Sequence, residues 1–225
     1  MLFSGGKDSV FALWCAIHQG YETACLLTIL PERSDSWMFH YPDVKWTRLQ
    51  AEAVRIPQVT AKASGVKEEE LGAMKEALVA LKRTHGIDCV VAGAIASEYQ
   101  RWRIETICHN LGLRSVAPLW RKDPENLLVE QVDMGFEFIM TACMAMGLGP
   151  EWLGRMIDRK AVDELRIVCR RYGISPVFEG GEAETYVLNA PMFTKRIQIA
   201  EARPVWKGDS GYLDIVRASL SDRAA

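Results

Sequence analysis

Six consecutive residues near the start of the chain, Ser4-Gly5-Gly6-Lys7-Asp8-Ser9, bring small, hydroxyl, cationic and acidic groups together. They join an apolar run, Met1–Phe3, to a helical pattern that begins at Val10. Adjacent glycines let a phosphate approach the backbone, where the N–H groups of the first helical turn point at it. The hydroxyls and the ammonium group would add donors and charge. The spacing is neither Walker A nor Gly-x-Gly-x-x-Gly, and the alternative is an ordinary glycine turn capped by Ser9.

A second chemically active group is the acidic turn Glu179-Gly180-Gly181-Glu182-Ala183-Glu184-Thr185. Carboxylates crowded this closely repel one another unless a cation lies among them, which would suit Mg²⁺, an amine or a cationic substrate. The plain alternative is a solvated acidic turn. Because the apolar run Tyr186-Val187-Leu188 follows at once, we expect the turn to lie at the end of a buried element.

A third group occupies the segment Gly93–Arg103, which follows a predicted buried strand. Its first residues, Gly93 and Ala94, are small enough to leave room for a nucleotide at a sheet edge. Two arginines offer charge for a phosphate or a carboxylate, and aromatic rings and an amide lie between them. The alternative is a polar loop and helix start with surface arginines.

Strands and helices alternate through the first half of the chain and must position these groups. The predicted strands cover residues 1–3, 23–30, 58–61, 87–94 and 115–119, and the predicted helices cover residues 10–19, 44–55, 67–85 and 101–111. This alternation predicts an α/β fold with a parallel five-stranded sheet and flanking helices, which is Rossmann-like. In such sheets ligands bind at the carboxyl ends of the strands, where the first glycine turn lies.

The pattern changes after Trp120, at the polar stretch Arg121–Asn126. We therefore expect two domains, an ATP-binding domain over residues 1–120 and a smaller α+β domain for the acceptor substrate over residues 121–225. Within the second domain we expect a strand or buried helix over residues 136–146, helices over residues 151–158 and 161–172, a strand over residues 197–201 and a frayed end over residues 219–225.

The composition argues against several classes of function. Of the 225 residues 25% are charged, and the formal net charge of −2 gives no basic surface for nucleic acid. No apolar stretch has the length of a membrane span and the start does not read as a secretory signal, so we expect a cytoplasmic protein. The six cysteines are scattered without a Cys-x-x-Cys pair, which indicates buried, reduced thiols.

These motifs together carry a family resemblance. The loop SGGKDS resembles the pyrophosphate (PP) loop of the ATP pyrophosphatases, which split ATP into AMP and pyrophosphate. With GAIASEYQRWRIE, APLW and EGGEAET followed by NAPMF, the chain closely resembles the diphthine–ammonia ligase family of archaea and eukaryotes. It departs from the family pattern in a first strand that is short, because the chain begins almost at the loop, and in Ala183, where an aromatic residue is usual.

The resemblance implies ATP-dependent amidation of diphthine, a modified histidine of elongation factor 2, to diphthamide. The carboxylate would be adenylated with release of pyrophosphate, and ammonia would displace AMP to form the amide. ATP would bind at Ser4, Gly5, Gly6, Lys7, Asp8, Ser9, Thr28, Ile29, Gly93 and Ala94, with Mg²⁺ at Asp8. The acceptor would bind at His40, Ser97, Tyr99, Gln100, Trp102, Glu179, Gly180, Gly181, Thr185 and Tyr186. The residues expected in catalysis are Lys7, Asp8, Arg103, Glu182 and Glu184.

The quaternary trimethylammonium group of diphthine gives a physical reason for placing acids beside aromatic rings. We therefore expect cation–π contacts from Tyr99, Trp102 and Tyr186, and charge pairing from Glu182 and Glu184. His40 is either a base for ammonium or a hydrogen-bonded structural residue.

Other functions stay open at this point. A PP-loop enzyme acting on tRNA or on another carboxylate is one, although thiolation enzymes of this kind usually carry paired cysteines. A glutamine-dependent amidotransferase is disfavoured, because no nucleophile follows Met1. A non-catalytic nucleotide-binding protein associated with translation is the third. The expected partners are ammonium and an elongation factor 2 that carries diphthine. We expect no contact with a membrane and no direct contact with nucleic acid. A homo-oligomer is left open.

Overall fold

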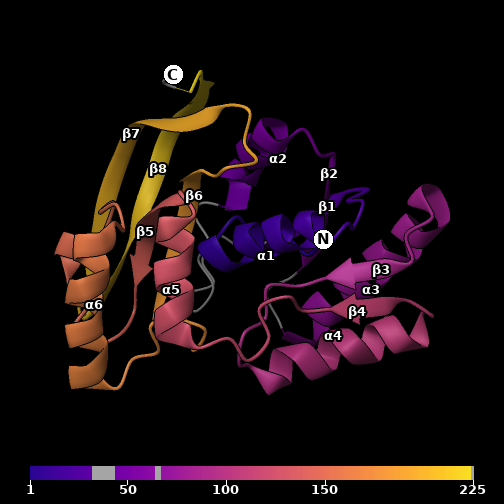
Figure 1. Ribbon diagram of the computed structural model, residues 1–225, viewed down its shortest axis with the longest axis horizontal. Helices are drawn as coiled ribbons and strands as arrows, with labels where there is room; N and C mark the ends of the chain where they lie inside the picture. The colour runs from indigo at the N-terminus through magenta and orange to yellow at the C-terminus, as the bar shows by residue number, and fades with distance from the viewer. Residues whose placement is uncertain (32–43, 64–66, 224–225) are drawn as a thin grey trace.

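The computed structural model describes residues 1–31, 44–63 and 67–223 (Figure 1). Its elements, in chain order, are α1 (Lys7–His18), β1 (Leu26–Pro31), η1 (Val44–Trp46), α2 (Thr47–Val54), β2 (Gln58–Ala63), α3 (Lys67–His85), β3 (Cys89–Val91), α4 (Glu98–Asn110), β4 (Arg114–Val116), α5 (Pro124–Asp133), β5 (Glu137–Cys143), η2 (Pro150–Trp152), α6 (Arg159–Tyr172), β6 (Ala183–Asn189), β7 (Arg196–Lys207) and β8 (Ser210–Ser221). In Figure 1, α1 lies between the C-terminal sheet with α5 and α6 on one side and α3, α4, β3 and β4 on the other.

The parallel strands of the first half form two separate pairs, β1 with β2 and β3 with β4. The segment Met1–Phe3 lies between the pairs, because the Leu2 N–H donates to the Val91 carbonyl (2.9 Å) and the Phe3 N–H to the Leu27 carbonyl (2.8 Å). The prediction of one five-stranded parallel sheet is therefore wrong in detail. Leu2 forms only an isolated bridge with Leu27, so the described residues show a mixed α/β fold with short parallel sheets.

The second half is built on a four-stranded antiparallel sheet in the order β6-β5-β8-β7. The segment that was predicted as strand or buried helix is the strand β5. The helix predicted over residues 151–158 is wrong, since only the short η2 forms in this region. The next helix, α6, begins after Asp158, whose side chain caps it by accepting the Ala161 N–H (2.8 Å). The predicted frayed end is also wrong up to Ser221, because β8 buries Leu213, Ile215 and Ala218.

Helix boundaries follow local capping. The helix predicted over residues 67–85 is confirmed as α3. The next helix, α4, begins three residues earlier than predicted, because the Ser97 hydroxyl accepts the N–H of Gln100 (3.3 Å) and caps it. The first helix, α1, also begins three residues earlier than predicted, within the glycine loop itself, so Lys7 and Asp8 are helical.

The apolar core consists of two clusters, of which the larger runs through both halves of the chain. Its larger cluster includes α1, α2, α5, α6 and the antiparallel sheet. The rings of Phe11 and Phe136 meet edge to face there, with centroids 5.1 Å apart. A smaller cluster fills the space between the parallel strands and helices α3 and α4, around Leu27, Leu78 and Val90. The larger core therefore fixes α1 and its loop against the second half.

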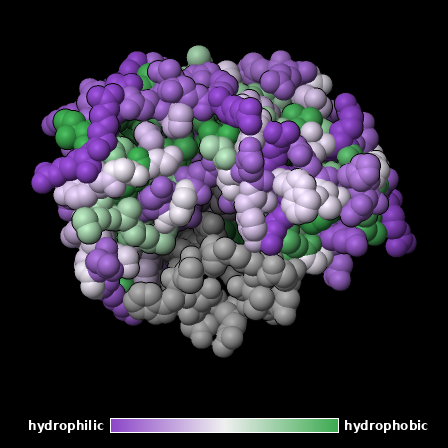
Figure 2. All heavy atoms as spheres, turned by 90° about the horizontal axis from the view of Figure 1, so that it is seen from below, coloured by the Kyte–Doolittle hydropathy of each residue, from purple (hydrophilic) through white to green (hydrophobic). Residues whose placement is uncertain are grey.

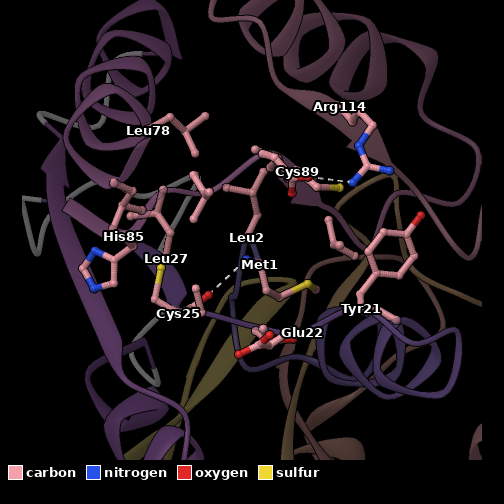
Figure 3. Close-up of a pocket in the computed structure, with 18 of the residues that line it drawn as sticks. Met1, Leu2, Tyr21, Glu22, Cys25, Leu27, Leu78, His85, Cys89 and Arg114 are labelled. Carbon is pink, nitrogen blue, oxygen red and sulfur yellow. Dashed lines mark hydrogen bonds and ion pairs between the residues drawn. The ribbon is translucent and has the colours of Figure 1, made fainter. Parts of the chain in front are cut away.

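A cavity of about 360 Å³ opens beside the amino group of Met1 (Figure 3). That ammonium group donates to the Cys25 carbonyl (3.1 Å), and burial lowers its pKa. The labelled wall residues include Tyr21, Glu22, Leu27, Leu78, Cys89 and Arg114. Because these walls precede or begin β1 and β3, the cavity lies at the amino ends of the strands, away from the glycine loop.

The surface gives no sign of a membrane segment among the residues that the structure describes. No helix in these ranges combines the length and the apolar character needed to cross a bilayer. On the face shown in Figure 2, hydrophilic side chains predominate among the coloured residues and hydrophobic ones form small, separate groups. No single apolar patch therefore marks a docking surface on the described part of this face.

Candidate active site at the glycine loop

The glycine loop leaves the start of α1 open to an anion. Gly6 is the N-cap and provides no side-chain cap. The Ser9 hydroxyl accepts the Gly5 N–H (3.1 Å) and donates to the Gly6 carbonyl (3.0 Å), which folds the loop onto the helix. Among the described residues no acceptor takes the N–H groups of Asp8 and Ser9, and Ser4 is exposed. An uncapped N-terminus of a 12-residue helix is suited to a phosphate.

Gly5 can be no other residue in this conformation. Its φ is +81°, and an added Cβ would lie 2.3 Å from Oε1 of Gln50. The Gln50 side chain is fully buried on α2, and its Nε2 donates to the carbonyls of Gly5 and Val187, both at 2.8 Å. The loop is thus tied to α2 and to β6. The sequence analysis missed Gln50, because an amide within the helix predicted over residues 44–55 carries no motif.

Lys7 is a fixed, buried cation and not a mobile one. Its side chain is 2% exposed. The Nζ atom donates to Oδ2 of Asp8 (2.6 Å) and to the Val177 carbonyl (2.7 Å), and it lies 5.3 Å from the centroid of the Phe178 ring. The expectation of a free phosphate-seeking side chain is therefore corrected, since two of the three donors of the ammonium group are taken. What Lys7 provides is positive charge at the base of the loop.

Asp8 lies in the first turn of α1 and is 24% exposed. Lys7 donates to one oxygen, and Nε2 of Gln131 on α5 donates to the other at 2.9 Å. Within the described ranges no group of three His, Cys, Asp or Glu residues could hold a metal ion. A single carboxylate of this kind still fits Mg²⁺, which keeps several waters and commonly takes one or two carboxylates together with substrate phosphates.

Glu179 binds the backbone of the first half of the chain. Its carboxylate accepts the N–H groups of Ile95 (2.8 Å), Ala96 (2.5 Å) and Ser97 (3.0 Å), just before α4. Charge-assisted bonds of this kind are strong, and they leave little of the carboxylate for a substrate. The prediction that Glu179 binds the acceptor is therefore corrected: it joins the acidic turn to the start of α4.

The remaining residues of the acidic turn divide into buried and accessible groups. The Thr185 hydroxyl accepts the Lys7 N–H (3.1 Å). Tyr186 is 1% exposed and its hydroxyl donates to the Trp46 carbonyl (2.8 Å), so the predicted cation–π contact with a substrate is wrong. Glu182 accepts the Ser175 N–H (3.3 Å) through Oε1, while its buried Oε2 has no partner in the described part of the chain. Partly buried Glu184 and exposed Gly180 and Gly181 complete the turn.

The first turns of α4 present the predicted aromatic and basic groups together. Tyr99 is 53% and Trp102 69% exposed, and Gln100 is also exposed. The guanidinium group of Arg103 lies 3.7 Å from the centre of the Tyr99 ring. Ser97, in contrast, caps the helix through its side chain. The rings of Tyr99 and Trp102 therefore lie on the surface, and that of Tyr99 is in contact with Arg103.

Four of the predicted ATP-binding residues lie outside the glycine loop, namely Thr28, Ile29, Gly93 and Ala94. The first two of these face inward. The Thr28 hydroxyl donates to the Phe3 carbonyl (2.8 Å) and Thr28 is 1% exposed, so the structure does not bring this side chain to a nucleotide. Ile29 packs against the smaller core cluster and is partly buried. Gly93 does reach the loop, since an added Cβ would lie 3.0 Å from the Asp8 backbone, whereas Ala94 is buried. His40 lies outside the described residues.

The cysteines are not part of this site. Burial raises the pKa of the Cys143 thiol to about 12 and that of Cys108 and Cys169 to about 11. Burial likewise raises the pKa of Cys15, Cys25 and Cys89. All six are free thiols, and two of them, Cys15 and Cys89, are only partly buried. Raised pKa values keep these thiols protonated and unreactive near neutral pH.

Fold and site define a mixed α/β protein with a glycine loop at a helix N-terminus. The family model described as the diphthamide synthase N-terminal domain matches residues 1–115, and the model described as the diphthamide synthase C-terminal domain matches residues 123–221. The chain belongs to the diphthamide synthase family.

Proteins named diphthine–ammonia ligase are its relatives. That of Schizosaccharomyces pombe is 32% identical over 99% of this chain, which spans only 39% of the yeast protein. That of Rattus norvegicus is 30% identical over 98% of this chain and 89% of its own length, and that of Homo sapiens is 30% identical over 91% and 83%. A crystal structure described as a predicted subunit of tRNA methyltransferase from Methanocaldococcus jannaschii aligns at TM-score 0.42 and 16% identity, covering 84% of this chain and 95% of that one.

Proposed function

We propose that this protein is an ATP-dependent ligase that amidates diphthine on elongation factor 2 to diphthamide. The observation that carries the proposal is the match of both diphthamide synthase models, which together span residues 1–115 and 123–221. Relatives named diphthine–ammonia ligase, aligned over 91% or more of the chain, support the same reaction. The uncapped helix at the glycine loop supports ATP as the activating substrate.

In the proposed reaction the glycine loop binds the nucleotide. The free N–H groups at the start of α1 and the exposed Ser4 hydroxyl would hold the β- and γ-phosphates, and the helix dipole would favour the departing pyrophosphate. Lys7, held by Val177, would supply charge without having to move. Asp8 would hold Mg²⁺, which when bound neutralises phosphate charge. ATP would thus be cleaved between its α- and β-phosphates.

The acceptor side falls to α4 and the acidic turn. The exposed rings of Tyr99 and Trp102 suit the trimethylammonium group of diphthine through cation–π contact. Glu182 and Glu184 would add negative charge, and Arg103 would orient the carboxylate that is activated. Ammonium would be the nitrogen donor, without glutamine.

We also propose that the chain divides into an ATP-binding domain, residues 1–120, and an acceptor domain, residues 121–225. The two family models, which end at residue 115 and resume at residue 123, support this division. Since Gln131, Val177 and Thr185 all bind the glycine loop, the proposed boundary separates two domains that build one site together.

The decisive experiment incubates the purified protein with ATP, ¹⁵N-ammonium and elongation factor 2 that carries diphthine. Mass spectrometry of the modified peptide should find the label in the new amide, and chromatography should find AMP. An unmodified peptide beside an active control enzyme would refute the proposal. Turnover with another carboxylate or with tRNA, or nucleotide binding without turnover, would instead support the alternatives considered above.

A further inference from the structure

A buried glutamine of the second half lies against the glycine loop. Gln131 is 0% exposed and lies in the last turn of α5. Its Nε2 donates to Oδ1 of Asp8 at 2.9 Å, across 123 positions of sequence. No motif of the sequence includes it, and no predicted site residue lies on α5.

The hydrogen bond from Gln131, together with that from Lys7, holds the Asp8 carboxylate from two sides. Lys7 donates to Oδ2 and Gln131 to Oδ1, so each oxygen receives one donor. Lys7 is itself held by the Val177 carbonyl. A carboxylate bonded on both oxygens by buried, immobile donors has its side-chain orientation fixed before any ligand binds.

Packing alone does not account for an amide at this position. Oε1 of Gln131 is buried and has no hydrogen-bond partner among the described residues. A buried acceptor without a partner is destabilising, so an apolar side chain of the same shape would be tolerated at least as well. The feature of Gln131 that no apolar residue could supply is its donor to Asp8.

We infer that Gln131 is a positioning residue that orients Asp8 toward Mg²⁺-bound ATP. The inference rests on the proposed function, in which Asp8 serves the metal and the phosphates. Gln131 does not itself touch the reacting atoms. Partners that orient a metal-binding carboxylate in this way typically change metal affinity or activity by about 10–100-fold when they are removed.

Three variants separate positioning from stability. Gln131→Met keeps the length and volume of the side chain but has no donor. Gln131→Glu keeps the shape, and its carboxyl can donate to Asp8 only while it is protonated; Lys7 is the charged group that the structure places against Asp8. Leu128→Ala, at a position on the same helix that is 1% exposed, loosens α5 without removing any contact to Asp8.

Two measurements are made on each full-length variant. Calorimetry gives the affinity for a non-hydrolysable ATP analogue with and without Mg²⁺, and AMP formation is followed as a function of pH. We expect Gln131→Met to lose about 10–100-fold in Mg²⁺-dependent affinity or in kcat, with metal-free binding unchanged. The deficit of Gln131→Glu should grow as the pH rises, because two ionised carboxylates repel each other. Leu128→Ala should lower the melting temperature without either effect.

The outcomes distinguish this inference from the proposed function. Wild-type Mg²⁺-dependent binding and kcat in Gln131→Met would overturn the positioning role, as would a wild-type protein that binds no Mg²⁺–ATP analogue. If the wild-type protein binds the analogue but fails to amidate diphthine, and Gln131→Met still weakens that binding, the proposed acceptor is wrong and the role of Gln131 stands.

Discussion

The ammonium group of Lys7 lies 2.7 Å from the carbonyl oxygen of Val177, a residue 170 positions further along the chain. This contact fixes the position of the Lys7 ammonium group, because Val177 belongs to the segment that leads into the acidic turn. Lys7 therefore has a structural as well as an electrostatic role, and its replacement affects both the free energy of unfolding and the reaction.

Lys7→Met should lower the free energy of unfolding by about 2–4 kcal/mol, because the Val177 carbonyl and the Asp8 carboxylate lose a buried charged partner. Urea denaturation measures this loss. Lys122→Met is the matched control, since Lys122 and its partner Glu130 are both 36% exposed and such pairs contribute about 0–1 kcal/mol. Equal losses in the two variants would contradict the buried anchoring of Lys7.

Glu179→Ala should release the turn before α4. The amides of Ile95, Ala96 and Ser97 lose their shared acceptor, so their hydrogen exchange should accelerate relative to that of the α4 interior. Exchange followed by NMR tests this residue by residue. Glu98→Gln, which alters a carboxylate that is 79% exposed, should leave these amides unchanged. Unchanged protection in Glu179→Ala would exclude the anchoring role.

Glu182→Gln and Glu184→Gln should strongly lower amidation and leave ATP affinity close to that of the wild type. Their carboxylates suit a cationic acceptor and would repel a triphosphate in the absence of a metal. Titration calorimetry with a non-hydrolysable ATP analogue and Mg²⁺ measures the second quantity. A loss of nucleotide binding in either variant would move these residues from the acceptor side to the metal side.

A complete reaction should yield AMP and pyrophosphate, because in the proposed function the start of α1, where Gly6 provides no side-chain cap, would hold the phosphates that leave together. Chromatography of the nucleotides identifies the products. ADP and inorganic phosphate as main products would contradict this prediction. Asp8→Ala should abolish turnover in the same assay, and it should also lower the free energy of unfolding, because the buried Lys7 ammonium loses its charged partner.

The buried thiols predict a loss of stability at alkaline pH. The pKa of Cys143 is about 12 in the folded protein, against 9.0 as its ordinary value. Between these values the unfolded chain binds fewer protons than the folded one, so the free energy of unfolding falls as pH rises. Cys143→Ala should show a shallower decline in urea denaturation across that range. An unchanged slope would show that this thiol ionises normally in the fold.

Local patterns in the sequence predicted the four helices of the first half well, but they missed α5 and predicted the direction of side chains poorly. The amphipathic spacing of residues 67–85 was sufficient for α3, because that helix follows from its own residues. Thr28, Glu179 and Tyr186 were expected to face a ligand, yet each is turned toward a partner that only the folded chain supplies. Their burial depends on contacts that no local pattern records.

The residues that hold the glycine loop in place could not be predicted from sequence patterns, for the same reason. Gln50 and Gln131 are single amides within helices, and neither belongs to one of the three chemically active groups of the sequence. The five-stranded sheet failed for a different reason. Met1–Phe3 makes only an isolated bridge, between Leu2 and Leu27, so the parallel strands stay in two pairs. Strand-like composition predicts a tendency to pair, whereas the folded chain decides which residues form a continuous ladder.

The loop at the start of the chain also has a consequence for the order of events during synthesis. It is bound by Gln131, Val177 and Thr185, which lie 123 to 178 positions later. Contacts between such distant segments form late, because the intervening chain must first be ordered. In a nascent chain the residues of the glycine loop are therefore made long before their partners, and these three contacts cannot all form until translation has passed Thr185.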